Sequence, residues 1–205
     1  MTFHLPEDLA PELYPLSWLL GRWQGFGMLG YEGIEERGIV TEMEITHDGG
    51  PYLRAVSTIW TADPGLSGPT HHEMAGSEGY ANLVKHTQWS TETSYVRPTS
   101  TTQQEEGGSH VELEVVTADP AGHLSLWLGA ARGPRLDIAT DAVISAPSAA
   151  RVTGSTRMFG LVQGDLLWAW DLAAFDQPLS SYASARLSRV PDAPAGTEPS
   201  ATEAS

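Results

Sequence analysis

The chain has 205 residues, a formal net charge of −15 and eleven basic residues, of which a single one is a lysine, Lys85. Binding to nucleic acid depends on clustered lysine and arginine, so the scattered arginines of this chain exclude nucleic acid as an expected partner. An anionic membrane surface would repel the chain. The length suits one domain with a substantial core, or at most two small ones.

The chain contains no cysteine, which removes disulfides, thiolate catalysis and cysteine-ligated metals or clusters. No run of eighteen apolar residues indicates a membrane span. The first sixteen residues lack the basic segment and following apolar segment of a secretory signal. These features together predict a cytoplasmic protein.

The N-terminal part predicts one helix, over about residues 6–20. Pro11 and Pro15 lie within this stretch and keep the helix short or broken, because proline lacks the backbone N–H and clashes with the preceding turn. A single small helix before the first strand suggests a plug or lid at one end of a β-barrel.

Residues 21–27 read GRWQGFG, a GxWxGxG pattern formed by Gly21, Trp23, Gly25 and Gly27. Glycine allows another backbone to come close, and within a strand it marks a bulge or a sharp bend. The glycines lead into a strand rather than a helix N-terminus, so the pattern is not a phosphate-binding loop. We interpret it as a barrel bend with a tryptophan that closes one end.

Most of the remaining chain alternates apolar and polar side chains, as half-buried strands do. The dipeptide Gln163-Gly164 reads as a tight hairpin turn. Several short strands with turn residues at regular intervals are typical of a sandwich or a barrel. The strand-like segments are residues 38–47, 51–60, 111–116, 123–129, 150–162, 165–173 and 181–190.

Two segments do not fit this pattern. Residues 61–79 are rich in Gly, Pro, Ser and Thr and predict a mobile insertion longer than an ordinary hairpin loop. Residues 191–205 have no aromatic or large aliphatic side chain, so they predict a disordered acidic tail. The predicted barrel domain therefore spans residues 1–190.

The order of these features resembles the nitrobindin family, which belongs to the calycin, or fatty-acid-binding-protein-like (FABP-like), group of β-barrels. Residues 9–27, LAPELYPLSWLLGRWQGFG, resemble the family's opening of a short helix and LLGxWxGxG. Residues 90–98, STETSYVRP, resemble a strand that reads H-x-E-[ST]-G-[YF]-x-R-P, and residues 157–187 resemble the closing hairpin and last strand. The resemblance covers residues 9–190.

The resemblance implies an all-β fold, a single antiparallel up-and-down barrel of about ten strands with a short N-terminal helix that caps one end. Family members bind haem b inside the barrel, and their ferric forms are associated with nitric oxide binding and with isomerising peroxynitrite to nitrate. Their axial histidine lies in a last-strand segment similar to QPLxxHLxAxL. This chain has Tyr182 in that column, and Ser90 where a second family histidine stands.

Tyrosinate can ligate ferric haem, but a phenol with an ordinary pKa near 10 needs a neighbouring cation to ionise. Arg186 is four residues on and would share a strand face with Tyr182, at roughly 13 Å along the strand. Arg157 on an adjacent strand is a second candidate. A buried, neutral, hydrogen-bonded Tyr182 is the favoured interpretation.

Other polar residues carry weaker predictions. Glu92 shares a face with Ser90 and needs a partner if it points inward, while Arg97 lies on the opposite face by parity. The run His71-His72-Glu73 does not predict a metal site, because adjacent side chains in an extended chain point to opposite sides.

His86 is expected at the surface or the barrel rim. Asp165 is expected to be a turn residue, and Asp171 to make a rim hydrogen bond.

Three functions remain open. The favoured one is a nitrobindin-like barrel that lacks the haem-ligating histidine, has no catalytic residues or metal, and holds a small hydrophobic or planar ligand in an apolar cavity. Tyr182, Ser90 and Glu92 are then the pocket candidates, and no cofactor is predicted. The second is a ferric haem b protein ligated through Tyr182 that acts on nitric oxide or peroxynitrite. The third is a structural or interaction module whose barrel is filled by side chains.

Overall fold

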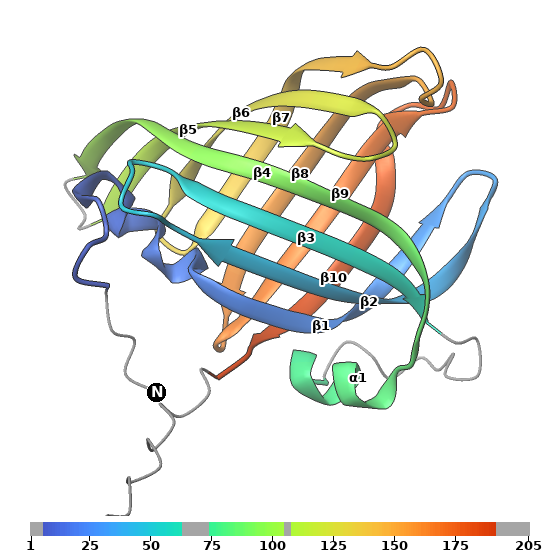
Figure 1. The fold of residues 1–205 in the computed structure, drawn as a ribbon, viewed down its shortest axis with the longest axis horizontal. Coiled ribbons are helices and arrows are strands. Elements are labelled where there is room, and N and C mark those ends of the chain that lie inside the picture. The colour runs from blue at the N-terminus through green and yellow to red at the C-terminus, as the bar shows by residue number, and fades with distance from the viewer. Residues whose placement is uncertain (1–5, 63–73, 105–107, 192–205) are drawn as a thin grey trace, which may run out of the picture.

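The chain forms a closed antiparallel β-barrel of ten strands (Figure 1), in a computed structural model that describes residues 6–62, 74–104 and 108–191. Each strand pairs with its neighbours in sequence, and the last strand closes the ring by pairing with the first. This confirms the predicted up-and-down barrel. The strands are β1 (Gly21–Tyr31), β2 (Ile34–Thr46), β3 (Leu53–Ala62), β4 (Lys85–Gln104), β5 (Gly108–Ala118), β6 (His123–Arg132), β7 (Arg135–Ser145), β8 (Val152–Val162), β9 (Asp165–Ala174) and β10 (Ser180–Arg189).

The predicted N-terminal helix is a 3₁₀ helix, η1 (Pro11–Leu19), and it is shorter than the expected residues 6–20. A 3₁₀ helix has three residues per turn, so side chains at a spacing of three lie on one face. Leu13, Leu16 and Leu19 have this spacing and are all buried. The short helix therefore presents an apolar stripe that closes one end of the barrel.

The GxWxGxG pattern lies at the start of β1, beside that closed end. Trp23 is 1% exposed, and its indole Nε1 donates a hydrogen bond to the Leu19 carbonyl oxygen at 2.8 Å. A Cβ atom on Gly25 or Gly27 would lie 2.0 or 1.9 Å from a backbone carbonyl oxygen of β10. The two glycines thus allow β10 to approach β1, while Trp23 fills the barrel end.

The predicted insertion, residues 61–79, lies partly outside the described residues, and its ends belong to regular elements. Thr61 and Ala62 complete β3, and a short helix, α1 (Gly76–Asn82), packs outside the barrel against β1 and β10. A Cβ on Gly79 would collide with the Phe26 ring, so glycine lets this helix lie flat on the barrel. Of the predicted tail, only Pro191 is described.

Among the irregularities of the ladder, three border the same part of the barrel interior. The β3–β4 register shifts at Trp89, and the β10–β9 register shifts at Tyr182. The backbone pairing of β7 with β8 covers only residues 135–139 and 156–160, although both strands continue beyond it. β-Bulges redirect side chains, and an unpaired stretch leaves the wall open. These three irregularities border one region of the barrel, and further register shifts occur in β1–β2, β4–β5, β6–β7 and β8–β9.

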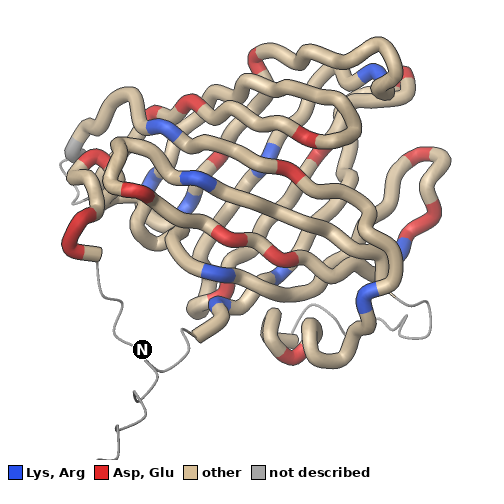
Figure 2. The backbone as a smooth tube through the Cα atoms, in the orientation of Figure 1, with Lys and Arg blue, Asp and Glu red and all other residues tan. Residues whose placement is uncertain are grey.

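Charged positions are spread over the whole barrel, with basic and acidic residues interspersed along the strands (Figure 2). Within the described ranges, no helix is both long and apolar enough to cross a membrane.

Candidate functional site

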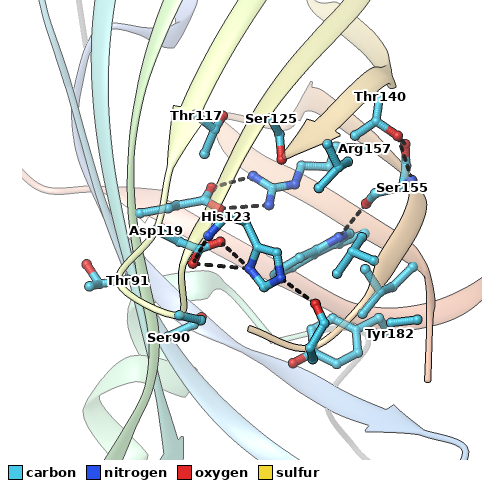
Figure 3. Close-up of a pocket in the computed structure, with 18 of the residues that line it drawn as sticks. Ser90, Thr91, Thr117, Asp119, His123, Ser125, Thr140, Ser155, Arg157 and Tyr182 are labelled. Atoms are coloured by element: carbon cyan, nitrogen blue, oxygen red, sulfur yellow. Dashed lines mark hydrogen bonds and ion pairs between the residues drawn. The ribbon is translucent and has the colours of Figure 1, made fainter. Parts of the chain in front are cut away.

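A cavity of about 430 Å³ lies inside the barrel, where β7 and β8 are not paired with each other. Its wall includes Ser90, Glu92 and Tyr182, so the structure brings the three sequence-predicted pocket residues together (Figure 3). The GxWxGxG residues do not line it. The other lining residues are Gln88, Trp89, Thr91, Thr117, Asp119, Pro120, Ala121, His123, Ser125, Trp127, Thr140, Val143, Ala150, Val152, Ser155, Arg157, Trp170, Leu172, Ala174 and Phe175.

Tyr182 is held at the cavity by the two β-bulges. Its side chain is buried, with the residue 9% exposed, and its hydroxyl accepts a hydrogen bond of 2.6 Å from the indole Nε1 of Trp89. Both residues occupy the bulged positions of their strands, which aim them at each other across the barrel. Burial raises the pKa of the Tyr182 phenol above its ordinary value, and the hydrogen bond from Trp89 opposes that shift only in part.

The expectation that Arg186 shares a strand face with Tyr182 is wrong, because β10 has a bulge at Tyr182. An even spacing along a regular strand would place Arg186 on the face of Tyr182, but the extra residue reverses the parity. Ala183, Ala185 and Leu187 are buried, and Arg186 instead binds Asp165, with 2.6 Å between its Nε and the carboxylate. Arg186 is therefore unable to act on the phenol.

Aromatic rings enclose Tyr182 on two further sides. The ring of Trp170 lies edge-on at 4.8 Å between centroids, and the ring of Tyr31 lies edge-on at 5.8 Å. The Tyr31 hydroxyl in turn donates to the Leu172 carbonyl oxygen at 2.9 Å. Edge-to-face contacts of this kind are favourable because a ring edge meets a ring face. The side chain of Tyr182 is therefore fixed in a preorganised aromatic corner.

Glu92 and Arg157 form an ion pair inside the barrel. Both nitrogens of the guanidinium fork bind the two carboxylate oxygens, with 2.8 Å for the Nη2–Oε2 contact, and the side chains are 9% exposed for Arg157 and 18% for Glu92. The guanidinium also lies over the rings of Trp127 and Trp170, at 4.7 and 4.2 Å from the centroids. Arg157 is thus the partner that an inward Glu92 requires, and Arg97 pairs with Glu114 instead.

The ion pair divides the interior of the barrel. The large cavity lies on one side, and a space of about 50 Å³ lies on the other, lined by Leu19, Met43 and Leu136 among other residues. The pair therefore forms the floor of the cavity, with the closed end of the barrel beneath it.

His123 contributes to the wall, and nothing in the sequence singled it out for this place. Its Nδ1 lies 3.2 Å from the Asp119 carboxylate, and its Nε2 lies 2.8 Å from the Ala150 carbonyl oxygen. The ring joins the β5–β6 turn to the β7–β8 connection beside the cavity (Figure 3). Both ring nitrogens are therefore engaged within the chain.

The remaining polar candidates lie outside the cavity. His86 is exposed, and Asp171 accepts a hydrogen bond from the Thr156 hydroxyl at 3.1 Å. Asp165 is not a simple turn residue: it is 8% exposed and accepts hydrogen bonds from Arg186, the Ser188 hydroxyl and a backbone N–H of α1.

The run His71-His72-Glu73 lies outside the described residues. Within them, no cluster of three or more His, Asp or Glu side chains could hold a metal ion.

Comparison with known proteins places this barrel in a family. A family model described as a THAP4-like, haem-binding β-barrel domain matches residues 12–189. A ferric nitrobindin-like protein of Beutenbergia cavernae is 46% identical over 93% of this chain and 100% of that protein. The chain belongs to the nitrobindin family.

Other nitrobindin relatives differ in the activity that their names give. A protein of Kineococcus radiotolerans, 40% identical over 93% of this chain and 99% of its own length, is also named a ferric nitrobindin-like protein. A protein of Leifsonia xyli, 37% identical over 91% of this chain and 98% of its own length, is named a peroxynitrite isomerase. The crystal structure of Rv2717c from M. tuberculosis has the same fold, with a TM-score of 0.65 and 26% identity over 90% of this chain and 100% of that one.

Proposed function

We propose that this nitrobindin-family barrel holds a small hydrophobic or planar ligand in its cavity, that it lacks the family's haem-ligating histidine, and that it is not an enzyme. The observation that carries this proposal is the state of Tyr182. Its phenol is buried, accepts a hydrogen bond from Trp89, and has a raised pKa. A neutral phenol is a poor axial donor, because iron ligation by tyrosine requires the anion.

No cation in the described residues is placed to stabilise a Tyr182 anion. Arg186 binds Asp165 outside the barrel wall, and both ends of the Arg157 fork are committed to Glu92. A buried phenolate without a cationic partner would bear the full cost of its desolvation. The electrostatics of the cavity thus support the neutral form.

Ligation of haem iron by a histidine elsewhere in the cavity wall is also not supported. Among the described histidines, His123 is the one that lines the cavity, and its two ring nitrogens face Asp119 and Ala150. An axial bond from either nitrogen would require the loss of one of these contacts. The residues present therefore do not fit a histidine-ligated haem.

The aromatic wall supports a planar or hydrophobic ligand instead. The side chains of Trp127, Trp170 and Tyr182 line a cavity of about 430 Å³, and apolar side chains such as Val143 and Val152 flank its unpaired wall. Cavities of this size with a few fixed polar groups are typical binding sites for small organic molecules.

A second candidate is a ferric haem protein ligated by Tyr182 that acts on nitric oxide or peroxynitrite. The description of the family model as haem-binding and the relatives named peroxynitrite isomerase favour it. The hydrogen bond from Trp89 also favours it, since a donor to the phenol oxygen lowers the pKa, although burial acts in the opposite direction and is the larger cause.

Titration with hemin, followed by visible absorption, decides between the two. We expect no saturable Soret change for the unmodified chain, saturable binding of a hydrophobic dye, and a gain of one-to-one hemin binding in Tyr182→His. A saturable Soret shift in the unmodified chain that disappears in Tyr182→Phe would overturn the proposal and establish the second candidate. Failure of both hemin and dye to bind would favour a barrel filled by its own side chains.

A further inference from the structure

The two carboxylates in the cavity wall, those of Glu92 and Asp119, already have hydrogen-bond donors. Both carboxylate oxygens of Glu92 accept from Arg157, and the Asp119 carboxylate accepts from the backbone N–H of His123 and contacts its ring at 3.2 Å. Each carboxylate in the wall is therefore satisfied by a neighbouring residue (Figure 3). A ligand that offers only hydrogen-bond donors would have to compete with these contacts.

The donors of the same wall are not all used. The Tyr182 oxygen accepts from Trp89, but within the described residues its own proton has no acceptor. The Nε of Arg157 and the Nε1 of Trp127 are buried and have no hydrogen-bond partner. Neither an indole N–H nor a guanidinium N–H can accept a hydrogen bond. The Tyr182 hydroxyl proton is therefore a donor without an acceptor among the described residues of the cavity wall, and Arg157 and Trp127, which also line the cavity, each have one further unpaired N–H.

A surplus of buried donors selects for an acceptor. An unpaired buried donor costs about 1–3 kcal/mol, so a ligand that supplies an acceptor gains affinity over an isostere that supplies none. The rings of Trp127, Trp170 and Tyr182 set the shape of the remaining wall and favour a planar aromatic body.

We propose that the ligand is a planar aromatic molecule whose polar group is an oxygen that accepts hydrogen bonds and carries no donor of its own. This oxygen accepts a hydrogen bond from the Tyr182 hydroxyl. The inference rests on the proposed function, since it assigns a ligand class to the same cavity. Tyr182 acts here as a hydrogen-bond donor to an organic ligand, and the ion pair of Glu92 and Arg157 forms the floor on which the aromatic body lies.

Four naphthalenes of similar size test the proposal by isothermal titration calorimetry: 2-acetylnaphthalene, 2-naphthoate, 2-methylnaphthalene and 2-naphthylmethylamine. We expect both oxygen acceptors to bind about fivefold more tightly than the methyl compound, which is the gain from one hydrogen bond of about 1 kcal/mol, and the amine to bind most weakly. Tyr182→Phe should remove that advantage, so that neither oxygen acceptor binds more tightly than 2-methylnaphthalene.

The matched control is Tyr14→Phe, because Tyr14 lies in η1, is 48% exposed and does not line the cavity. It should leave all four affinities unchanged. Equal binding of the four compounds, tightest binding of the amine, or an acceptor advantage that persists in Tyr182→Phe would each overturn the inference and leave the proposed function standing.

A gain confined to 2-naphthoate would also overturn the inference, since charge rather than hydrogen bonding would then set the preference. If none of the four compounds binds, both the inference and the proposed function fail.

Discussion

Substitution of Glu92 by glutamine should destabilise the barrel far more than the same change at an exposed glutamate, because Glu92 is paired with Arg157 inside the barrel. The change is nearly isosteric and removes one charge, so Arg157 remains as a cation that is 9% exposed without its carboxylate. Removal of one partner from a buried ion pair costs about 3–5 kcal/mol. The contacts of the guanidinium with Trp127 and Trp170 remain and offset part of that cost.

We therefore expect Glu92→Gln to lower the free energy of unfolding by about 3 kcal/mol, or the melting temperature by about 6–12 °C for a domain of this size. The matched control is Glu114→Gln. It breaks the Arg97–Glu114 pair on the outside of the barrel, where the side chains are 62% and 37% exposed. An exposed pair contributes at most about 1 kcal/mol, so the control should cost little.

Urea denaturation followed by tryptophan fluorescence measures both variants. The double variant Glu92→Gln with Arg157→Met removes both charges and should recover stability to within about 1 kcal/mol of the unmodified chain. The reasoning would be refuted if Glu92→Gln cost no more than Glu114→Gln, or if the double variant were no more stable than Glu92→Gln alone.

Three further changes test other contacts. Gly27→Ala should cost about 2–3 kcal/mol in urea unfolding, because its Cβ would lie 1.9 Å from a carbonyl oxygen, whereas Gly38→Ala, with its nearest atom at 3.5 Å, should cost little. Tyr182 has a raised pKa in the folded state, so it contributes stability below about pH 10 that is lost at higher pH; Tyr182→Phe should flatten that loss in unfolding measured from pH 8 to 11. Asp165→Asn should speed hydrogen exchange in α1, whose first amide it binds, and unchanged exchange would contradict this role.

The barrel was predictable from the sequence because each strand carries its own signal. Alternation, turn dipeptides and the GxWxGxG pattern are local, and the ring joins strands that are consecutive in the chain. The N-terminal helix was predicted in the right place without its type: Pro11 and Pro15 limit an α-helix but are compatible with a short 3₁₀ helix whose leucines repeat every three residues.

The site was only partly predictable, because parity along a strand fails wherever the ladder has an extra residue. Ser90 and Tyr182 were singled out by the resemblance to the nitrobindin family and Glu92 by its shared face with Ser90, and all three line the cavity. The bulge at Trp89 turns an unremarked tryptophan toward Tyr182, and the bulge at Tyr182 places Arg186 on the other face.

Two further parts of the site depend on tertiary structure alone. Arg157 and Glu92 are separated by 65 positions, so no local pattern identifies them as partners. His123 opens β6 and meets Ala150 only because two turns come together.

Because of the bulge on β10, the residue that places its side chain at the cavity is not one of the residues whose backbone pairs with β9. Ser181 and Ala183 carry the ladder contacts with β9 on either side, and Tyr182 is the residue that the ladder omits. Its side chain can therefore be exchanged without shifting the register of the last strand against its neighbours. A barrel built in this way can keep one architecture while the side chain at position 182, which lines the cavity, changes its chemistry by a single substitution.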